Sequence, residues 1–102
     1  MRLTDKAMIV LDQTANVFGV EKKDIISRSQ KQHVSETRQV VWYVLRDYYK
    51  EAEIAKMFKR DRSTVYSGIE HAYQLISVDS KFQRKVNIIE ENIQTQILWD
   101  EQ

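Results

Sequence analysis

The sequence predicts an all-α fold: one compact helical domain over residues 1–102, with a helix-turn-helix and an extra C-terminal helix. Three observations lead to this prediction. The chain has no proline and only two glycines, Gly19 and Gly68, and proline and glycine are the residues that most disfavour helices. Apolar residues recur at helical spacing along most of the length. Hydrophobic residues make up 42% and charged residues 30% of the chain, which suits a domain with a single buried core.

The first half of the chain predicts two longer helices and a short helical turn. Thr4 can cap a helix that runs to about Phe18, with Gly19 as its left-handed C-cap. Residues 22–26 predict one short helical turn, and the polar, basic segment 27–34 predicts a loop. Ser35 is a suitable N-cap for a helix over residues 36–49, whose unbroken apolar run predicts burial on more than one side.

Residues 51–76 predict the helix-turn-helix. In the first helix, residues 51–58, Ile54 and Phe58 lie one turn apart, and Ala55 is small where a second helix would cross. The turn is expected at residues 59–61, although Lys59 stands where many such turns carry glycine. The second helix would face back with apolar residues spaced by four, three and four, namely Val65, Ile69, Ala72 and Ile76. Gly68 would allow the helix to pack closely on that side.

The opposite face of the second helix is polar, and its N-terminal end has the properties of a DNA-reading surface. Ser63 and Ser67 are small enough to enter a major groove of about 12 Å. Arg62 can donate two hydrogen bonds to guanine, worth roughly 1–3 kcal/mol of discrimination. Asp61 can cap the helix and can also accept a bond from cytosine. The alternative is a helical hairpin whose polar face is only solvated.

A last helix is predicted over residues 79–99, with Asp79 or Ser80 as its cap. Its apolar stripe consists of Phe82, Val86, Ile89, Ile93 and Ile97, with Leu98 and Trp99 after it. We expect this stripe to fold back on the core, because a small domain needs the burial. The alternative is self-association or a protein partner that binds through this helix.

From about residue 17 to residue 86 the chain resembles the C-terminal DNA-binding domain of the bacterial replication initiator DnaA, a Trp-repressor-like fold. Four stretches carry the resemblance: residues 20–28 (VEKKDIISR), 37–47 (TRQVVWYVLRD), 54–65 (IAKMFKRDRSTV) and 77–86 (SVDSKFQRKV). The third is similar to the family signature I-G-x-x-F-x-x-D-H-[ST]-T-V. The resemblance implies a sequence-specific binder of double-stranded DNA that acts in replication initiation or its regulation.

The resemblance also implies individual roles. Arg38 matches an arginine that the family inserts into the minor groove, and Asp61, Arg62 and Ser63 match positions that read bases in the major groove. Thr64 and Ser67 match positions that contact phosphate. From charge alone, we expect further phosphate contacts from Lys56, Lys59 and Arg60, and His71 lies on the phosphate side. Arg62 replaces the family's histidine, so the same target sequence should not be assumed.

Several functions are disfavoured by what the sequence lacks. It has no cysteine and therefore no cysteine-ligated zinc, no phosphate-binding G-x-x-x-x-G-K-[ST] loop, and no nucleophile paired with a base. We therefore expect no enzyme activity, metal, cofactor or small-molecule substrate, and no membrane segment. Residues 21–74 hold eleven Lys and Arg against eight Asp and Glu. We expect a cytoplasmic, nucleoid-associated protein; the alternatives are a Trp-repressor-like transcription regulator and a protein-interaction module.

Overall fold

Helices account for the architecture throughout the part of the chain that is described. The computed structural model describes the backbone of residues 3–100 and the side chains of residues 3–97. Within this range there is no strand. The helices are α1 (Asp5–Phe18), α2 (Lys22–Ile25), α3 (Gln32–Leu45), α4 (Glu51–Phe58), α5 (Arg62–Val78) and α6 (Ser80–Asp100). The predicted all-α fold is confirmed.

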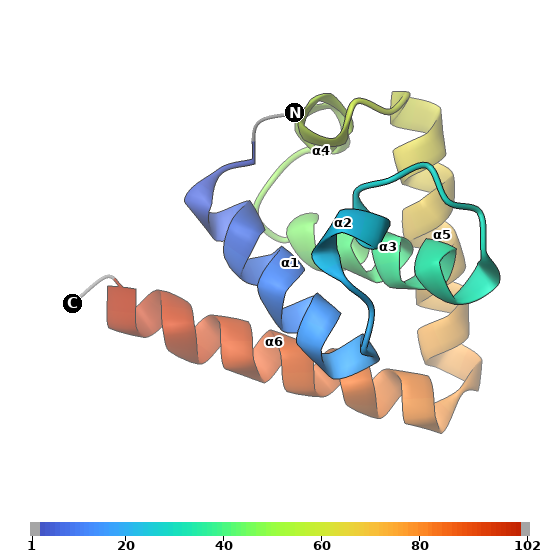
Figure 1. Ribbon diagram of the computed structural model, residues 1–102. Coiled ribbons are helices and arrows are strands. Elements are labelled where there is room, and N and C mark those ends of the chain that lie inside the picture. The colour runs from blue at the N-terminus through green and yellow to red at the C-terminus, as the bar shows by residue number, and fades with distance from the viewer. Residues whose placement is uncertain (1–2, 101–102) are drawn as a thin grey trace.

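Helix α3 lies at the centre of the molecule, with α5 packed along one side of it and α1 along another (Figure 1). Val40, Val41 and Leu45 of α3 are completely buried. Helix α4 packs against α5, and α6 runs beside α1 on the side away from α4 (Figure 1). This arrangement leaves the N-terminal half of α5 and the adjoining α2–α3 loop at the surface.

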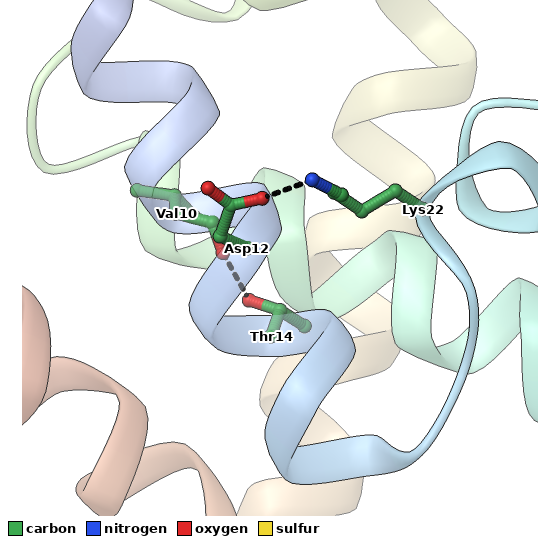
Figure 2. A network of polar contacts seen from close by, with 4 residues as sticks. All are labelled: Val10, Asp12, Thr14 and Lys22. Atoms are coloured by element: carbon green, nitrogen blue, oxygen red, sulfur yellow. Dashed lines mark hydrogen bonds and ion pairs between the residues drawn. The ribbon is translucent and has the colours of Figure 1, made fainter.

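Local capping signals determine both ends of α1. The Thr4 side chain accepts a hydrogen bond from the Ala7 backbone N–H at 3.1 Å, and Gly19 ends the helix with φ at 67°. Both features are confirmed as predicted, because an N-cap hydroxyl and a left-handed glycine satisfy terminal backbone groups within one turn. Figure 2 shows the Asp12 carboxylate beside the Lys22 ammonium group, 2.7 Å apart. This exposed ion pair joins α1 to α2.

The predicted limits of the central helix are wrong. Helix α3 begins at Gln32 with Lys31 as its N-cap, so the predicted loop over residues 27–34 is shorter and Ser35 lies inside the helix. Its other end is Leu45 rather than Tyr49. The chain turns after Leu45, and the two tyrosines that follow contact the start of α1: the Tyr49 hydroxyl hydrogen-bonds to Thr4, and the Lys6 ammonium group lies over the Tyr48 ring.

The C-terminal helix folds back on the core as predicted. The Asp79 carboxylate caps it by accepting hydrogen bonds from the backbone N–H groups of Lys81 and Phe82. Its apolar stripe is buried at Val86, Ile89 and Ile93 and packs against α1. The side chains of Leu98 and Trp99 lie outside the described residues. Self-association or a protein partner through this helix stays a prediction.

Candidate DNA interface

Helices α4 and α5 form the predicted helix-turn-helix. Ile54, Ala55 and Phe58 of α4 and Val65 and Ile69 of α5 are all buried in the same hydrophobic core. Lys59 ends α4 in the left-handed conformation, with φ at 54°. It therefore occupies the backbone region in which glycine is usual at this kind of turn.

The start of α5 exposes the predicted polar residues. Asp61 occupies the N-cap position, but its carboxylate makes no capping hydrogen bond, so its oxygens are free of the helix backbone. Arg62, Ser63, Thr64 and Ser67 are exposed on the first turns of the helix. This end of α5 can therefore approach a ligand without rearrangement of the fold.

A groove of about 810 Å³ runs beside this end of α5 and extends to α3 and the α2–α3 loop. It brings together residues that lie up to 43 positions apart: Arg28, Gln30, Ser35, Arg38, Gln39, Trp42, Lys59, Arg60, Asp61, Ser63, Thr64, Ser67, Gly68 and His71. Four of these carry lysine or arginine charge, and Asp61 is the single acidic one. The groove therefore favours a negatively charged ligand.

The spacing of the two helices that form the groove depends on Gly68, as the sequence predicted. A β-carbon at this position would lie 2.7 Å from Cε3 and 2.8 Å from Cζ3 of Trp42, which is closer than carbon atoms pack. The indole is buried on α3 and its Nε1 has no hydrogen-bond partner among the described residues. Across the same contact, His71 Nδ1 and Gln39 Oε1 lie 2.6 Å apart. These contacts hold α5 close to α3.

The structure places Arg38, the expected minor-groove residue, against backbone carbonyls of its own chain. This side chain is only 6% exposed, and its guanidinium donates hydrogen bonds to the backbone carbonyls of Ile25, Asp24 and Ser29, at 2.6, 3.3 and 3.0 Å. Burial, and then the charge of Arg60, lowers the pKa of Arg38. Arg38 therefore lies in the wall of the groove. Insertion into a minor groove would require these bonds to break, and that role stays a prediction.

Sequence reasoning missed Arg28, which is the counterpart of Arg60. The Arg28 guanidinium donates to the Lys59 carbonyl at 3.2 Å, and the Arg60 guanidinium donates to the Ser27 carbonyl at 2.8 Å. Burial, and then the charge of Arg28, lowers the pKa of Arg60. The only sequence signal for this pair is the basic character of the segment around Arg28, which does not specify a partner.

Two predicted contact residues lie outside this groove. Arg62 lines a neighbouring hollow of about 510 Å³ on the other side of α5, together with Arg46 and Lys50. Lys56 is exposed on α4 and lines neither hollow. Three basic side chains therefore line this second hollow, together with the acidic Glu51.

Neither a metal centre nor a membrane segment is found in the described part of the chain. No group of three or more His, Asp or Glu side chains there is placed to hold a metal ion. No helix there is long and apolar enough to cross a membrane. His33 lies 3.1 Å from the Phe18 carbonyl oxygen, which gives it a structural contact at the end of α1.

The similarity to known proteins includes the segment that forms the helix-turn-helix. The family model described as bacterial dnaA protein helix-turn-helix matches residues 8–71. Proteins named chromosomal replication initiator protein DnaA are similar to this chain. The one from Pseudothermotoga lettingae is 34% identical over 65% of the chain, and the one from Chloroflexus aurantiacus is 31% identical over 86%. The chain spans 15% and 19% of these relatives' own length.

Proposed function

The chain belongs to the family of bacterial DnaA helix-turn-helix domains, and from this premise we propose that it binds double-stranded DNA in a sequence-specific manner. The observation that supports this proposal most strongly is the groove beside α5, where basic side chains adjoin the exposed polar start of a helix. Positive charge attracts the phosphate backbone and places the protein on the duplex, while the helix end reaches base edges. Both elements lie next to each other on one surface.

We assign base reading to Asp61, Arg62 and Ser63. All three are exposed at the start of α5, which is the part of a second helix that reaches base edges in helix-turn-helix complexes. The Arg62 guanidinium can donate two parallel hydrogen bonds to O6 and N7 of guanine, and the unbonded Asp61 carboxylate can accept from the amino group of cytosine. Discrimination between sequences should depend most on Arg62.

We assign phosphate contacts to the basic and hydroxyl side chains around this helix end. Thr64, Ser67 and His71 lie along the groove side of α5, and Lys59 and Arg60 lie in the turn. Lys56, exposed on α4, would extend the contact beyond the groove. These contacts carry no sequence information and would contribute to every duplex.

We place the protein in replication initiation or its regulation, because the relatives carry the name of a replication initiator. The chain covers less than a fifth of their length, and it contains no G-x-x-x-x-G-K-[ST] loop. We therefore propose that this chain acts by binding, without ATP hydrolysis or other catalysis, in the cytoplasm at the nucleoid.

Selection of bound duplexes from a random pool, followed by affinity measurements on the selected and a scrambled sequence, tests this function. We expect binding to the selected site to weaken as salt rises. A plot of log K for binding against the logarithm of the salt concentration should have a slope of about −0.9 for each phosphate neutralised. Arg62→Ala should reduce the preference for the selected sequence by roughly 5- to 150-fold, because it removes one bidentate base contact.

Arg84→Ala provides the matched control, because Arg84 is exposed on α6 and lines neither hollow. This variant should keep the sequence preference of the unchanged protein. Equal, weak and salt-independent binding to all duplexes would refute the proposal and would favour an interaction module that works through α6.

A further inference from the structure

We propose that Arg28, Arg38 and Arg60 form a binding site for a single phosphate group, the phosphate seat. The bound anion would hold the α2–α3 loop against the turn of the helix-turn-helix. The three side chains come from the α2–α3 loop, from α3 and from the turn, and all line the same groove. The phosphate can belong to a DNA backbone or be free in solution. The seat itself needs no DNA, but its occupation by a DNA phosphate rests on the proposed function.

The α2–α3 loop and the turn of the helix-turn-helix contact each other reciprocally. Arg28 reaches from the loop to the Lys59 carbonyl in the turn, and Arg60 reaches from the turn to the Ser27 carbonyl in the loop. Each guanidinium is therefore held near the backbone from which the other originates. An anion placed between them would contact both segments at once.

Arg28, Arg38 and Arg60 line one groove, and among the described side chains none of them forms an ion pair with a carboxylate. Burial, and then the charge of Arg60, lowers the pKa of Arg38, and burial, and then the charge of Arg28, lowers the pKa of Arg60. The ion pairs found between the described side chains lie elsewhere, at Asp12–Lys22 and Glu21–Lys23. Gathered like charges normally require a counter-ion.

The three guanidinium groups keep N–H donors that no hydrogen bond among the described residues uses. A guanidinium carries five N–H donors in a fixed fork. The three groups together donate six hydrogen bonds, all of them to backbone carbonyls. Most of the unused donors belong to Arg28 and Arg60. Planar forks that are already oriented by carbonyl contacts suit a tetrahedral oxyanion, because charge-assisted bonds to phosphate then cost little further ordering.

Thermal unfolding of the whole chain in phosphate and in chloride at equal ionic strength tests the seat without any DNA. We expect phosphate at about five times its dissociation constant to raise the melting temperature by roughly 4–8 °C relative to chloride. Arg28→Gln and Arg60→Gln should abolish this difference. Arg84→Gln should retain it, because Arg84 also donates to a backbone carbonyl but lies on α6, outside the groove.

The variants keep the test informative even if one of them is unstable. Arg28 is exposed and makes a single hydrogen bond, so Arg28→Gln should fold whatever happens to Arg60→Gln. Arg28→Lys retains the charge but loses the fork, and it should lose most of the phosphate effect. An equal rise in melting temperature for the unchanged protein and for Arg28→Gln would overturn the seat.

Competition separates the two sources of phosphate. If a DNA phosphate occupies the seat, free phosphate should weaken duplex binding more than chloride at equal ionic strength, and Arg28→Gln should remove this excess. Phosphate-specific stabilisation without competition would support the seat and assign it to free phosphate. A chain that binds no duplex but keeps the phosphate effect would refute the proposed function alone. Duplex binding without any phosphate effect would refute the seat alone.

Discussion

The close approach of α5 to α3 makes Gly68→Ala a sharp test of the packing described above. The added β-carbon would lie 2.7 and 2.8 Å from two atoms of the Trp42 ring and 3.1 Å from Cγ of Gln39. The ring cannot move aside easily, because it is 3% exposed and meets the Phe58 ring edge-to-face with centroids 6.1 Å apart. The helices must therefore separate or the core must distort.

The expected magnitude combines two opposing effects. Inserting a methyl group into a well-packed core costs about 1–3 kcal/mol. Replacing glycine by alanine inside a helix returns up to about 1 kcal/mol. The single variant should therefore lose between about 0 and 3 kcal/mol of stability. It should also widen the groove and stretch the hydrogen bond between Gln39 and His71, so its affinity for DNA should fall.

A double-mutant cycle isolates the contact. Trp42→Phe replaces the two-ring indole by a single ring and so removes the atoms that the added β-carbon would approach. It also removes the buried indole N–H that has no partner among the described residues. In this background Gly68→Ala should stabilise the chain by up to about 1 kcal/mol through helix propensity alone. We therefore expect a coupling of roughly 1–3 kcal/mol, measured by urea unfolding followed by far-ultraviolet circular dichroism. A coupling below about 0.5 kcal/mol would refute the reasoning, because independent sites add to within that margin.

Two further predictions concern α6. Ile93→Ala should cost roughly 2–5 kcal/mol of stability in urea unfolding of the monomer, because Ile93 is fully buried; a loss of oligomer with no loss of monomer stability would contradict the fold-back arrangement. Burial, and then the charge of Asp47, raises the pKa of Glu90 above 4.5, and Arg46 opposes the shift. Because a raised carboxyl pKa disfavours the folded state while the group is charged, Glu90→Gln should stabilise the chain at neutral pH. The gain in stability from Glu90→Gln should shrink as pH falls through the raised pKa of Glu90 toward 4.5. Unfolding curves that show the same gain in stability at every pH would exclude the charge of Glu90 as its cause.

Local signals in the sequence were enough to predict the helix caps and most of the helices. Thr4, Gly19 and Asp79 act within one helical turn, so their capping roles could be predicted from residue type and position. Helical spacing likewise identified α4, the start of α5 and the buried stripe of α6, because one face of a helix repeats every three or four residues. The need for Gly68 beside a packed helix followed from the same spacing.

The end of α3 and the contacts of the arginines depend instead on residues that are distant in the chain. Helix α3 ends at Leu45, and Tyr48 and Tyr49 beyond it contact Lys6 and Thr4 at the start of α1, residues more than 40 positions away in the chain. Arg38 and Arg60 donate to backbone carbonyls, which every residue possesses and which therefore leave no pattern in the sequence. Which carbonyl an arginine reaches, and whether its charge faces a groove or the interior, depends on how the helices pack together.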